Sequence, residues 1–122
     1  MSRVKVLVYG TLRHGERAEY LLGTNRKMLG AVRVPGFDIY HLGSFPGIRP
    51  NPTGTITCDL FEIDESEVRG LDRYEGEGSL YIRDEVELES GDRAFIYIYN
   101  HTPQEKEKIE SGEWKSVNYG RD

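Results

Sequence analysis

Glu75 is the residue whose type and position most clearly suggest chemistry. Residues 64–75 are predicted to form a helix, and Val68 and Leu71 mark its apolar side. Glu75 follows Val68 by seven residues and Leu71 by four, so its carboxyl should face the protein interior. It also lies in the last turn, where the helix dipole disfavours a negative charge. Burial and the dipole both raise a carboxyl pKa, and such a group can accept a proton and return it.

The same pattern leaves one alternative open for Glu75, which is a frayed helix end with the side chain turned out to solvent. Asp72 shares part of the apolar face, because it lies four residues after Val68. Its short side chain suits local hydrogen bonds to the backbone. We therefore favour a structural role for Asp72, either in such bonds or in an ion pair with Arg73 or Arg83.

A second candidate site follows the first predicted strand, at residues 9–13 (YGTLR). Gly10 would let the backbone approach a ligand closely, and successive N–H groups in such a turn can bind a negatively charged oxygen. A plain strand-to-helix turn is the competing explanation. The segment is too short for a phosphate-binding loop and lacks the lysine that such a loop requires.

The sequence shows no motif for a metal site, a disulfide, a nucleophile elbow or a dinucleotide-binding loop. His14, His41 and His101 lack the spacing of metal ligands, so no metal is expected. Cys58 is the single cysteine, which excludes an intrachain disulfide and favours a buried thiol in a strand. There is no G-x-S-x-G nucleophile motif and no dinucleotide-binding fingerprint, although a Ser/His/Asp triad stays open.

Length and composition indicate a single domain spanning residues 1–122. The formal net charge is −5 and no Lys/Arg stripe occurs, so nucleic acid is an unsuitable partner. No apolar run approaches about 20 residues, which argues against a membrane span. The N-terminus lacks the features of a signal peptide, and a cytoplasmic protein is expected.

Short strands joined by turns are the elements that must position these residues. Extended segments are expected at residues 4–9, 27–34, 37–42, 55–63, 80–88 and 93–99. Pro35–Gly36 should break the second from the third, and residues 43–54 should form a stiff, proline-rich loop. The pattern indicates an α+β fold with a mixed or antiparallel sheet that can curl into a barrel.

Two or three short helices are expected beside these strands. The first covers residues 16–22 and stops at Gly23. The second begins with a capping box formed by Asp64 and Glu67 and ends at Gly76. A second capping box, at residues 102–105, should start a surface helix near the C-terminus.

Taken together, these motifs resemble the gamma-glutamyl cyclotransferase-like superfamily, which includes the AIG2-like proteins. The resemblance covers nearly the whole chain and rests on the order and spacing of five segments. They are VYGTL (8–12), Pro46–Gly47, GTITCDLFEID (54–64), LDRYEG (71–76) with Tyr81 after it, and ESGEW (110–114). Two departures occur: Thr11 replaces the usual serine but keeps its hydroxyl, and Cys58–Asp59 stands where Gly-Glu is common.

The resemblance implies a small mixed β-barrel flanked by short helices, and a reaction without a cofactor. The substrate would be a gamma-glutamyl compound, and the products 5-oxoproline and a free amine or amino acid. Glu75 matches the family's catalytic glutamate and would act as general acid/base. The N–H groups of Tyr9, Gly10, Thr11 and Leu12 would hold the substrate, and Tyr81 would wall or orient its glutamyl unit.

Two other functions fit the same sequence. One is a non-catalytic protein of this fold that binds a gamma-glutamyl or related small ligand, with Glu75 as a contact. The other is a protein-interaction module without a small ligand. The leaving group is left open among an amino acid, a Cys-Gly unit, a lysine ε-amine and other amines, as is the oligomeric state.

Overall fold

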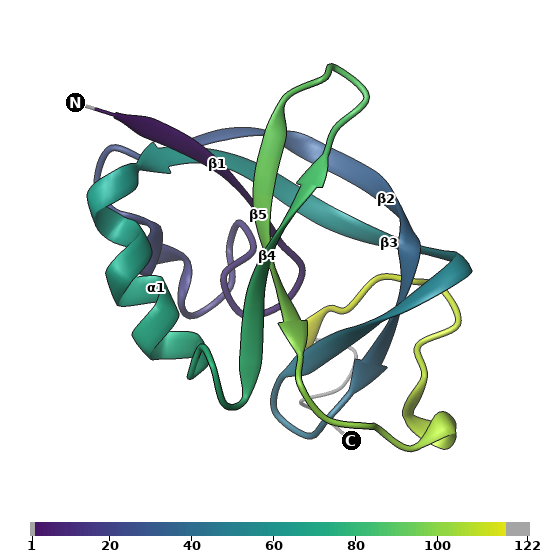
Figure 1. Ribbon diagram of the computed structural model, residues 1–122. Coiled ribbons are helices and arrows are strands. Elements are labelled where there is room, and N and C mark those ends of the chain that lie inside the picture. Colours follow the sequence, from purple (N-terminus) through teal and green to yellow (C-terminus); the bar gives the residue numbers. More distant parts are fainter. Residues whose placement is uncertain (1, 117–122) are drawn as a thin grey trace.

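Within residues 2–116, which the computed structural model describes, five strands form a mixed sheet (Figure 1). In chain order they are β1 (Arg3–Val8), β2 (Lys27–His41), β3 (Pro46–Asp64), β4 (Tyr81–Glu87) and β5 (Arg93–Tyr99). Their order across the sheet is β2-β3-β1-β5-β4, so β1 lies at the centre. It runs antiparallel to β3 and parallel to β5, whereas β2–β3 and β4–β5 are antiparallel pairs. The predicted α+β class with a mixed sheet is confirmed.

The central strand β1 separates two hydrophobic cores. Successive side chains of a strand point to opposite faces. Leu7 therefore packs in the core that contains Cys58 and Trp114, while Val6 and Val8 pack in the second core, beside Leu71. Both faces are covered at the C-terminal end of β1, and the last three residues of the strand are all apolar and buried. Cys58 is fully buried, as expected, and its burial raises the thiol pKa to about 12.

The sheet curls because the long β2–β3 pair bends back toward the end of β5. The Nη1 atom of Arg49, in the first half of β3, donates a hydrogen bond of 2.8 Å to the Tyr99 carbonyl. Gly47 packs so tightly on Tyr99 that a Cβ on it would lie 2.8 Å from the Tyr99 Cβ. The edge strands β2 and β4 form no ladder with each other within the described residues. The predicted barrel is therefore an open one.

Two predicted interruptions of the strands are wrong. Pro35–Gly36 does not end a strand, because β2 continues to His41 with only a register shift between Pro35 and Phe37. The predicted loop over residues 43–54 is mostly the first part of β3. Proline fits there because β1 pairs with β3 only from Asp59 onward, and on the earlier unpaired edge a missing N–H costs no ladder bond.

Helix α1 (Val68–Glu75) packs its apolar side on the second core and follows a 3-10 turn at Glu65–Glu67. It ends at Gly76, as predicted, whose left-handed φ of 64° suits glycine. The predicted capping box is wrong, because the Asp64 carboxylate accepts hydrogen bonds from Arg3 (2.8 Å) and Asn25 (3.0 Å) instead. The helix expected at residues 16–22 is one 3-10 turn, Glu19–Leu22, before Gly23.

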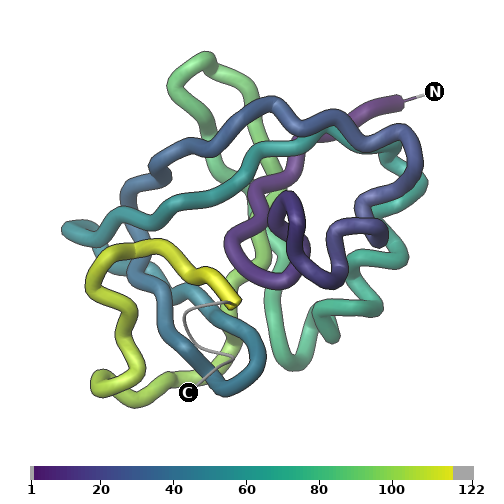
Figure 2. Tube along the Cα trace, turned by 180° about the vertical axis from the view of Figure 1, so that it is seen from behind, coloured from purple at the N-terminus to yellow at the C-terminus, as the bar shows by residue number. Residues whose placement is uncertain are grey.

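The expected C-terminal surface helix is also wrong. Residues 102–115 contain a single 3-10 turn, Glu105–Glu107, followed by an isolated bridge from Lys108 to Tyr40 and otherwise irregular chain. Ile109 donates its N–H to the Ile39 carbonyl, and the Gly112 carbonyl accepts from Thr57. These bonds place the segment across the β2–β3 pair (Figure 2), where buried Trp114 completes the first core. A helix would have removed both bonds to the sheet.

Candidate active site

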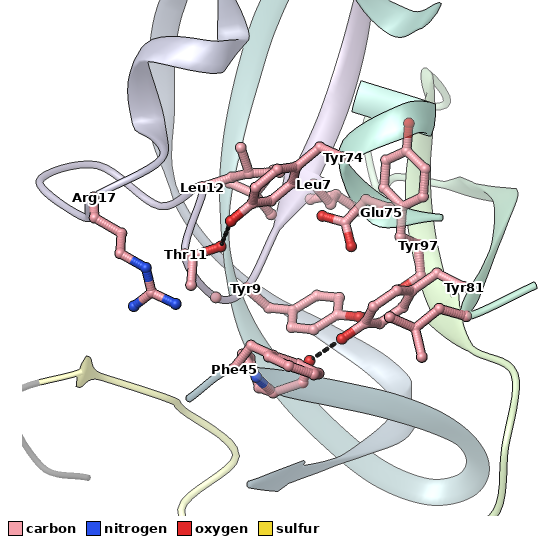
Figure 3. A pocket seen from close by; sticks show the side chains of 14 residues that line it. Leu7, Tyr9, Thr11, Leu12, Arg17, Phe45, Tyr74, Glu75, Tyr81 and Tyr97 are labelled. Carbon is pink, nitrogen blue, oxygen red and sulfur yellow. Dashed lines mark hydrogen bonds between the residues drawn. The ribbon is translucent and has the colours of Figure 1, made fainter. Parts of the chain in front are cut away.

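All six residues predicted for the site lie around one cavity of about 220 Å³ at the end of β1 (Figure 3). They are Tyr9, Gly10, Thr11, Leu12, Glu75 and Tyr81. The first four follow β1, Glu75 ends α1, and Tyr81 begins β4. The cavity therefore forms where the end of the central strand meets the end of the helix.

Helix α1 aims Glu75 into this cavity. The helix stops immediately after it because Gly76 donates its N–H to the Arg73 carbonyl and Glu77 donates to the Asp72 carbonyl. This pair of bonds is the Schellman arrangement, which satisfies carbonyls at a helix end. The Glu75 carboxyl points inward, between the rings of Tyr9, Tyr81 and Tyr97 (Figure 3). The alternative of a frayed helix end with a solvent-facing carboxyl does not describe this structure.

The Glu75 carboxyl is the ionisable group best suited to proton transfer in the cavity. It is partly buried and has no hydrogen-bond or ion-pair partner among residues 2–116. Burial without a compensating partner disfavours the charged form, and it raises the pKa of Glu75 from 4.5 to about 7. At neutral pH this carboxyl is present in both protonation states, which is the condition for an efficient acid/base group.

Tyrosine side chains form a rigid wall opposite and beside Glu75. The Tyr9 hydroxyl donates to the Tyr97 carbonyl, and the Tyr81 hydroxyl donates to the Pro46 carbonyl, each at 2.5 Å. Burial raises the pKa of Tyr9, Tyr81 and Tyr97, and the nearby Glu75 carboxylate adds to each increase. These hydroxyls therefore stay protonated and fix the rings, so they shape the cavity without supplying a proton.

Asp72 has the structural role that we favoured from the sequence. Its carboxylate accepts a hydrogen bond of 2.7 Å from the Tyr97 hydroxyl and forms an ion pair of 3.1 Å with Arg83. Asp72 therefore holds the Tyr97 ring from behind, outside the cavity. The two carboxylates of α1 have separate functions, one tied into the fold and the other directed at the cavity.

The segment after β1 is a tight turn whose first N–H groups are not used within the loop. The Gly10 carbonyl accepts from Arg13 and the Thr11 carbonyl from Ala18, whereas the N–H groups of residues 10–12 enter no loop or turn hydrogen bond within the described chain. Glycine is required at position 10 for packing, since a Cβ there would lie 2.6 Å from the Pro46 Cγ. The expected need for close ligand approach is thus not the only reason for Gly10.

Arg13 anchors this turn to the rest of the protein. Its guanidinium binds both carboxylate oxygens of buried Asp59, at 3.1 Å each, and pairs with Glu113 at 2.9 Å. The same group donates to the Trp114 carbonyl, and Asp59 also accepts the His14 N–H. Asp59, whose role the sequence left open, is therefore a structural anchor behind the loop.

Eight further residues line the cavity that the sequence did not indicate for the site, namely Leu7, Val8, Arg17, Phe45, Pro46, Tyr74, Leu80 and Tyr97. Tyr74 could have been suspected because it shares the last turn of α1 with Glu75, and its hydroxyl bonds the Thr11 Oγ1 at 2.8 Å. Side chains alternate between the two faces of β5, and this alternation directs Tyr97 toward the second core. Arg17 and Phe45 carry no local signal, because only the path of the chain brings their loops together.

Within residues 2–116 no group of three or more His, Cys, Asp or Glu side chains is arranged to hold a metal ion. In the same part of the chain, no helix has both the length and the apolar character needed to cross a bilayer. What the cavity offers is one proton-exchanging carboxyl, a set of N–H groups and a rigid aromatic wall. That combination suits proton transfer within a small bound molecule.

Comparison with known proteins gives a consistent result. The family model described as gamma-glutamyl cyclotransferase, AIG2-like, matches residues 6–116. The gamma-glutamylcyclotransferase family protein YtfP of Escherichia coli K12 is 31% identical over 111 residues, which cover 91% of this chain and 96% of the relative.

Solved structures share the same fold. The solution structure of Escherichia coli YtfP superimposes with a TM-score of 0.72 at 30% identity, covering 94% of this chain and 99% of that one. An uncharacterized protein from Pyrococcus horikoshii, PH0828, reaches a TM-score of 0.80 at 26% identity, covering 94% and 92% of the two chains. The sequence match, the fold and the site agree, and the chain belongs to the gamma-glutamyl cyclotransferase, AIG2-like family.

Proposed function

We propose that this protein is a cyclotransferase that releases 5-oxoproline and a free amine or amino acid from a gamma-glutamyl compound. The observation that carries the proposal is the Glu75 carboxyl, which faces the cavity without a partner and has a pKa raised to about 7. Family membership agrees with a cyclotransferase-type function. Glu75 is then the general acid/base, and Tyr9, Gly10, Thr11, Leu12 and Tyr81 contact the substrate.

The reaction needs only proton transfers around one molecule. Glu75 takes a proton from the α-ammonium group of the glutamyl unit. The freed amine attacks the γ-carbonyl carbon and forms the C–N bond of a five-membered ring. The original γ-amide C–N bond then breaks as Glu75 returns its proton to the leaving nitrogen. The ring nitrogen gives up its second proton to the released amine, which leaves as an ammonium group. Water is not consumed, and the two products together contain all the atoms of the substrate.

The dimensions of the cavity suit this reaction. A volume of about 220 Å³ is below the range of about 300–1,000 Å³ found for drug-sized ligands, so the cavity suits a small substrate. Nucleophile and electrophile belong to the same molecule, and holding them in a reactive geometry can supply several kcal/mol of the barrier. N–H groups at the end of β1 would hold negatively charged oxygens of the glutamyl unit.

The first prediction is that Glu75→Gln folds normally and loses at least about 10²-fold in rate, because one positioned acid/base typically contributes about 10²- to 10⁴-fold. The assay measures 5-oxoproline released from a panel of gamma-glutamyl amino acids and gamma-glutamylamines. Glu77→Gln is the matched control, since Glu77 follows two residues later, does not line the cavity and binds the Arg83 N–H.

Near-normal turnover by Glu75→Gln would defeat the assignment of the acid/base. Wild-type protein that binds members of the panel but releases no 5-oxoproline would instead favour a non-catalytic binding protein of this fold. Circular dichroism of each variant shows that a lost rate reflects chemistry and not unfolding.

A further inference from the structure

Arg17 is the charged side chain at the rim of the cavity, and the reaction above leaves it without a role. The lining residues divide by exposure: Leu7, Val8 and Tyr81 are buried and form the floor, whereas Arg17, Tyr74 and Leu80 are exposed and form the rim. Figure 3 shows the Arg17 guanidinium across Thr11 from the Glu75 carboxyl. Glu75 and Arg17 are the charged groups among the lining residues, and they lie at opposite sides of the cavity.

The charge of Arg17 is not neutralised within the described part of the chain. Its guanidinium donates one hydrogen bond, of 3.1 Å, to the Ser44 carbonyl, and no carboxylate among residues 2–116 pairs with it. The neighbouring carboxylate of Glu19 is engaged elsewhere, with His14 at 3.0 Å and Arg26 at 3.3 Å. Four of the five N–H donors of Arg17 are therefore available to a ligand at the rim.

The direction of the substrate in the cavity decides which ligand group meets Arg17. If the glutamyl unit sits against the N–H groups of residues 10–12 and within reach of Glu75, the buried floor leaves no room for a substituent. The group on the leaving nitrogen must then extend toward the rim. The Tyr74 hydroxyl there is already bonded to Thr11, so Arg17 is the side chain that can select a charge.

We propose that Arg17 is a specificity residue that binds the carboxylate of the leaving group, so that gamma-glutamyl amino acids are preferred over uncharged gamma-glutamylamines. A guanidinium presents paired donors that match the two oxygens of a carboxylate. This inference rests on the proposed function, because it concerns the outer end of the same substrate.

The test compares two compounds that differ only in the charge at that end, gamma-glutamylalanine and gamma-glutamylalaninamide. Wild-type kcat/KM should be about 3- to 10-fold higher for the acid, the size expected of a partly exposed ion pair with good geometry. Arg17→Gln should abolish the preference through KM with little change in kcat, and Arg17→Lys should retain part of it. Arg69→Gln, which removes an exposed arginine of α1 outside the cavity, should keep the wild-type ratio.

Equal wild-type kcat/KM values for the two compounds would overturn the proposal. So would an Arg17→Gln variant that loses the same factor with both, because Arg17 would then act on the glutamyl unit or on the fold.

A failure of the proposed function is distinguished by binding measurements. If neither compound yields 5-oxoproline, calorimetry on the same proteins measures the two dissociation constants directly. Tighter binding of the acid that disappears in Arg17→Gln supports the role of Arg17 without catalysis. Equal affinities, or no binding of either compound, overturn it.

Discussion

The Glu75 carboxyl is harder to ionise in the folded protein than in the unfolded chain, and this difference links stability to pH. Burial raises its pKa from 4.5 to about 7. Below pH 4.5 the group is protonated in both states and has no effect. Between these values the folded state keeps a proton that the unfolded chain has released, so the free energy of unfolding falls as pH rises. Above about pH 7 the cost is constant and complete.

Glu75→Gln should therefore be more stable than the wild type at alkaline pH. The difference should be small at pH 5 and reach about 2 kcal/mol at pH 8, because each unit of pKa shift corresponds to about 1.4 kcal/mol and partial exposure reduces the full value. Urea unfolding at each pH measures it.

Glu77→Gln serves as the control for the loss of one negative charge. A stability gain of Glu75→Gln that stays the same from pH 5 to pH 8 would contradict a buried carboxyl with a raised pKa. The expected result is a variant that is more stable but less active. It would mean that an ionisable group in this apolar cavity lowers the stability of the wild-type protein.

At the scale of the element, the end of α1 determines where Glu75 points. Gly76 adopts a φ of 64°, where a side chain is strained, and a Cβ there would also lie 3.3 Å from the Leu80 Cβ. We predict that Gly76→Ala lowers the free energy of unfolding by about 1–2 kcal/mol. It should also lower the rate of 5-oxoproline release, because a shifted helix end moves the carboxyl. Chemical denaturation and the activity assay check the two effects.

Gly70 provides the matched control within the same helix. A Cβ on Gly70 would meet no atom within 4 Å, and its backbone is helical. Gly70→Ala should therefore stabilise the protein by roughly 0.5–1 kcal/mol through helix propensity and leave the rate unchanged. Equal effects of alanine at positions 70 and 76 would show that the left-handed end of α1 does not position Glu75.

The parts of this architecture that were predictable from the sequence depend on local patterns. The apolar side of α1 and its end at Gly76 follow from residues within three turns of one another, and so does the inward direction of Glu75. The capping box failed because Arg3, distant in sequence, competes for the Asp64 carboxylate. Pro46 begins a strand because the neighbouring edge is free, which is a property of the whole sheet.

The contrast between local patterns and distant contacts also explains which residues of the candidate site were predictable. Glu75 and residues 9–12 lie at the ends of elements that the sequence makes visible. Arg17 and Phe45 lie on loops, and they reach the cavity only because the sheet curls and brings those loops to the end of β1. Local patterns therefore identified the Glu75 carboxyl and the segment after β1, but not the rim that we infer selects the substrate.

At the scale of the whole molecule, the cavity depends on contacts that join distant segments. Arg13 links the turn after β1 to Asp59 of β3 and to Glu113 and Trp114 near the C-terminus. The side chains of Arg13 and Asp59 are only 12% and 5% exposed, so their charges are largely removed from water. The C-terminal segment thus closes the first core and also steadies the loop that lines the site.

The buried Arg13–Asp59 ion pair leads to a prediction about the stability of variants that lack it. Asp59→Ala should lower the free energy of unfolding by about 3 kcal/mol, because it leaves the Arg13 guanidinium buried with one partner fewer and the His14 N–H without its acceptor. Glu113→Ala removes the more exposed partner, whose side chain is 31% exposed, and should cost less than about 1 kcal/mol. The double variant Arg13→Met/Asp59→Ala should be no less stable than Asp59→Ala, since the unpaired charge is gone. Urea unfolding of the three proteins measures these differences, and a double variant that is clearly less stable than Asp59→Ala would contradict the unpaired Arg13 charge as the cause of the loss.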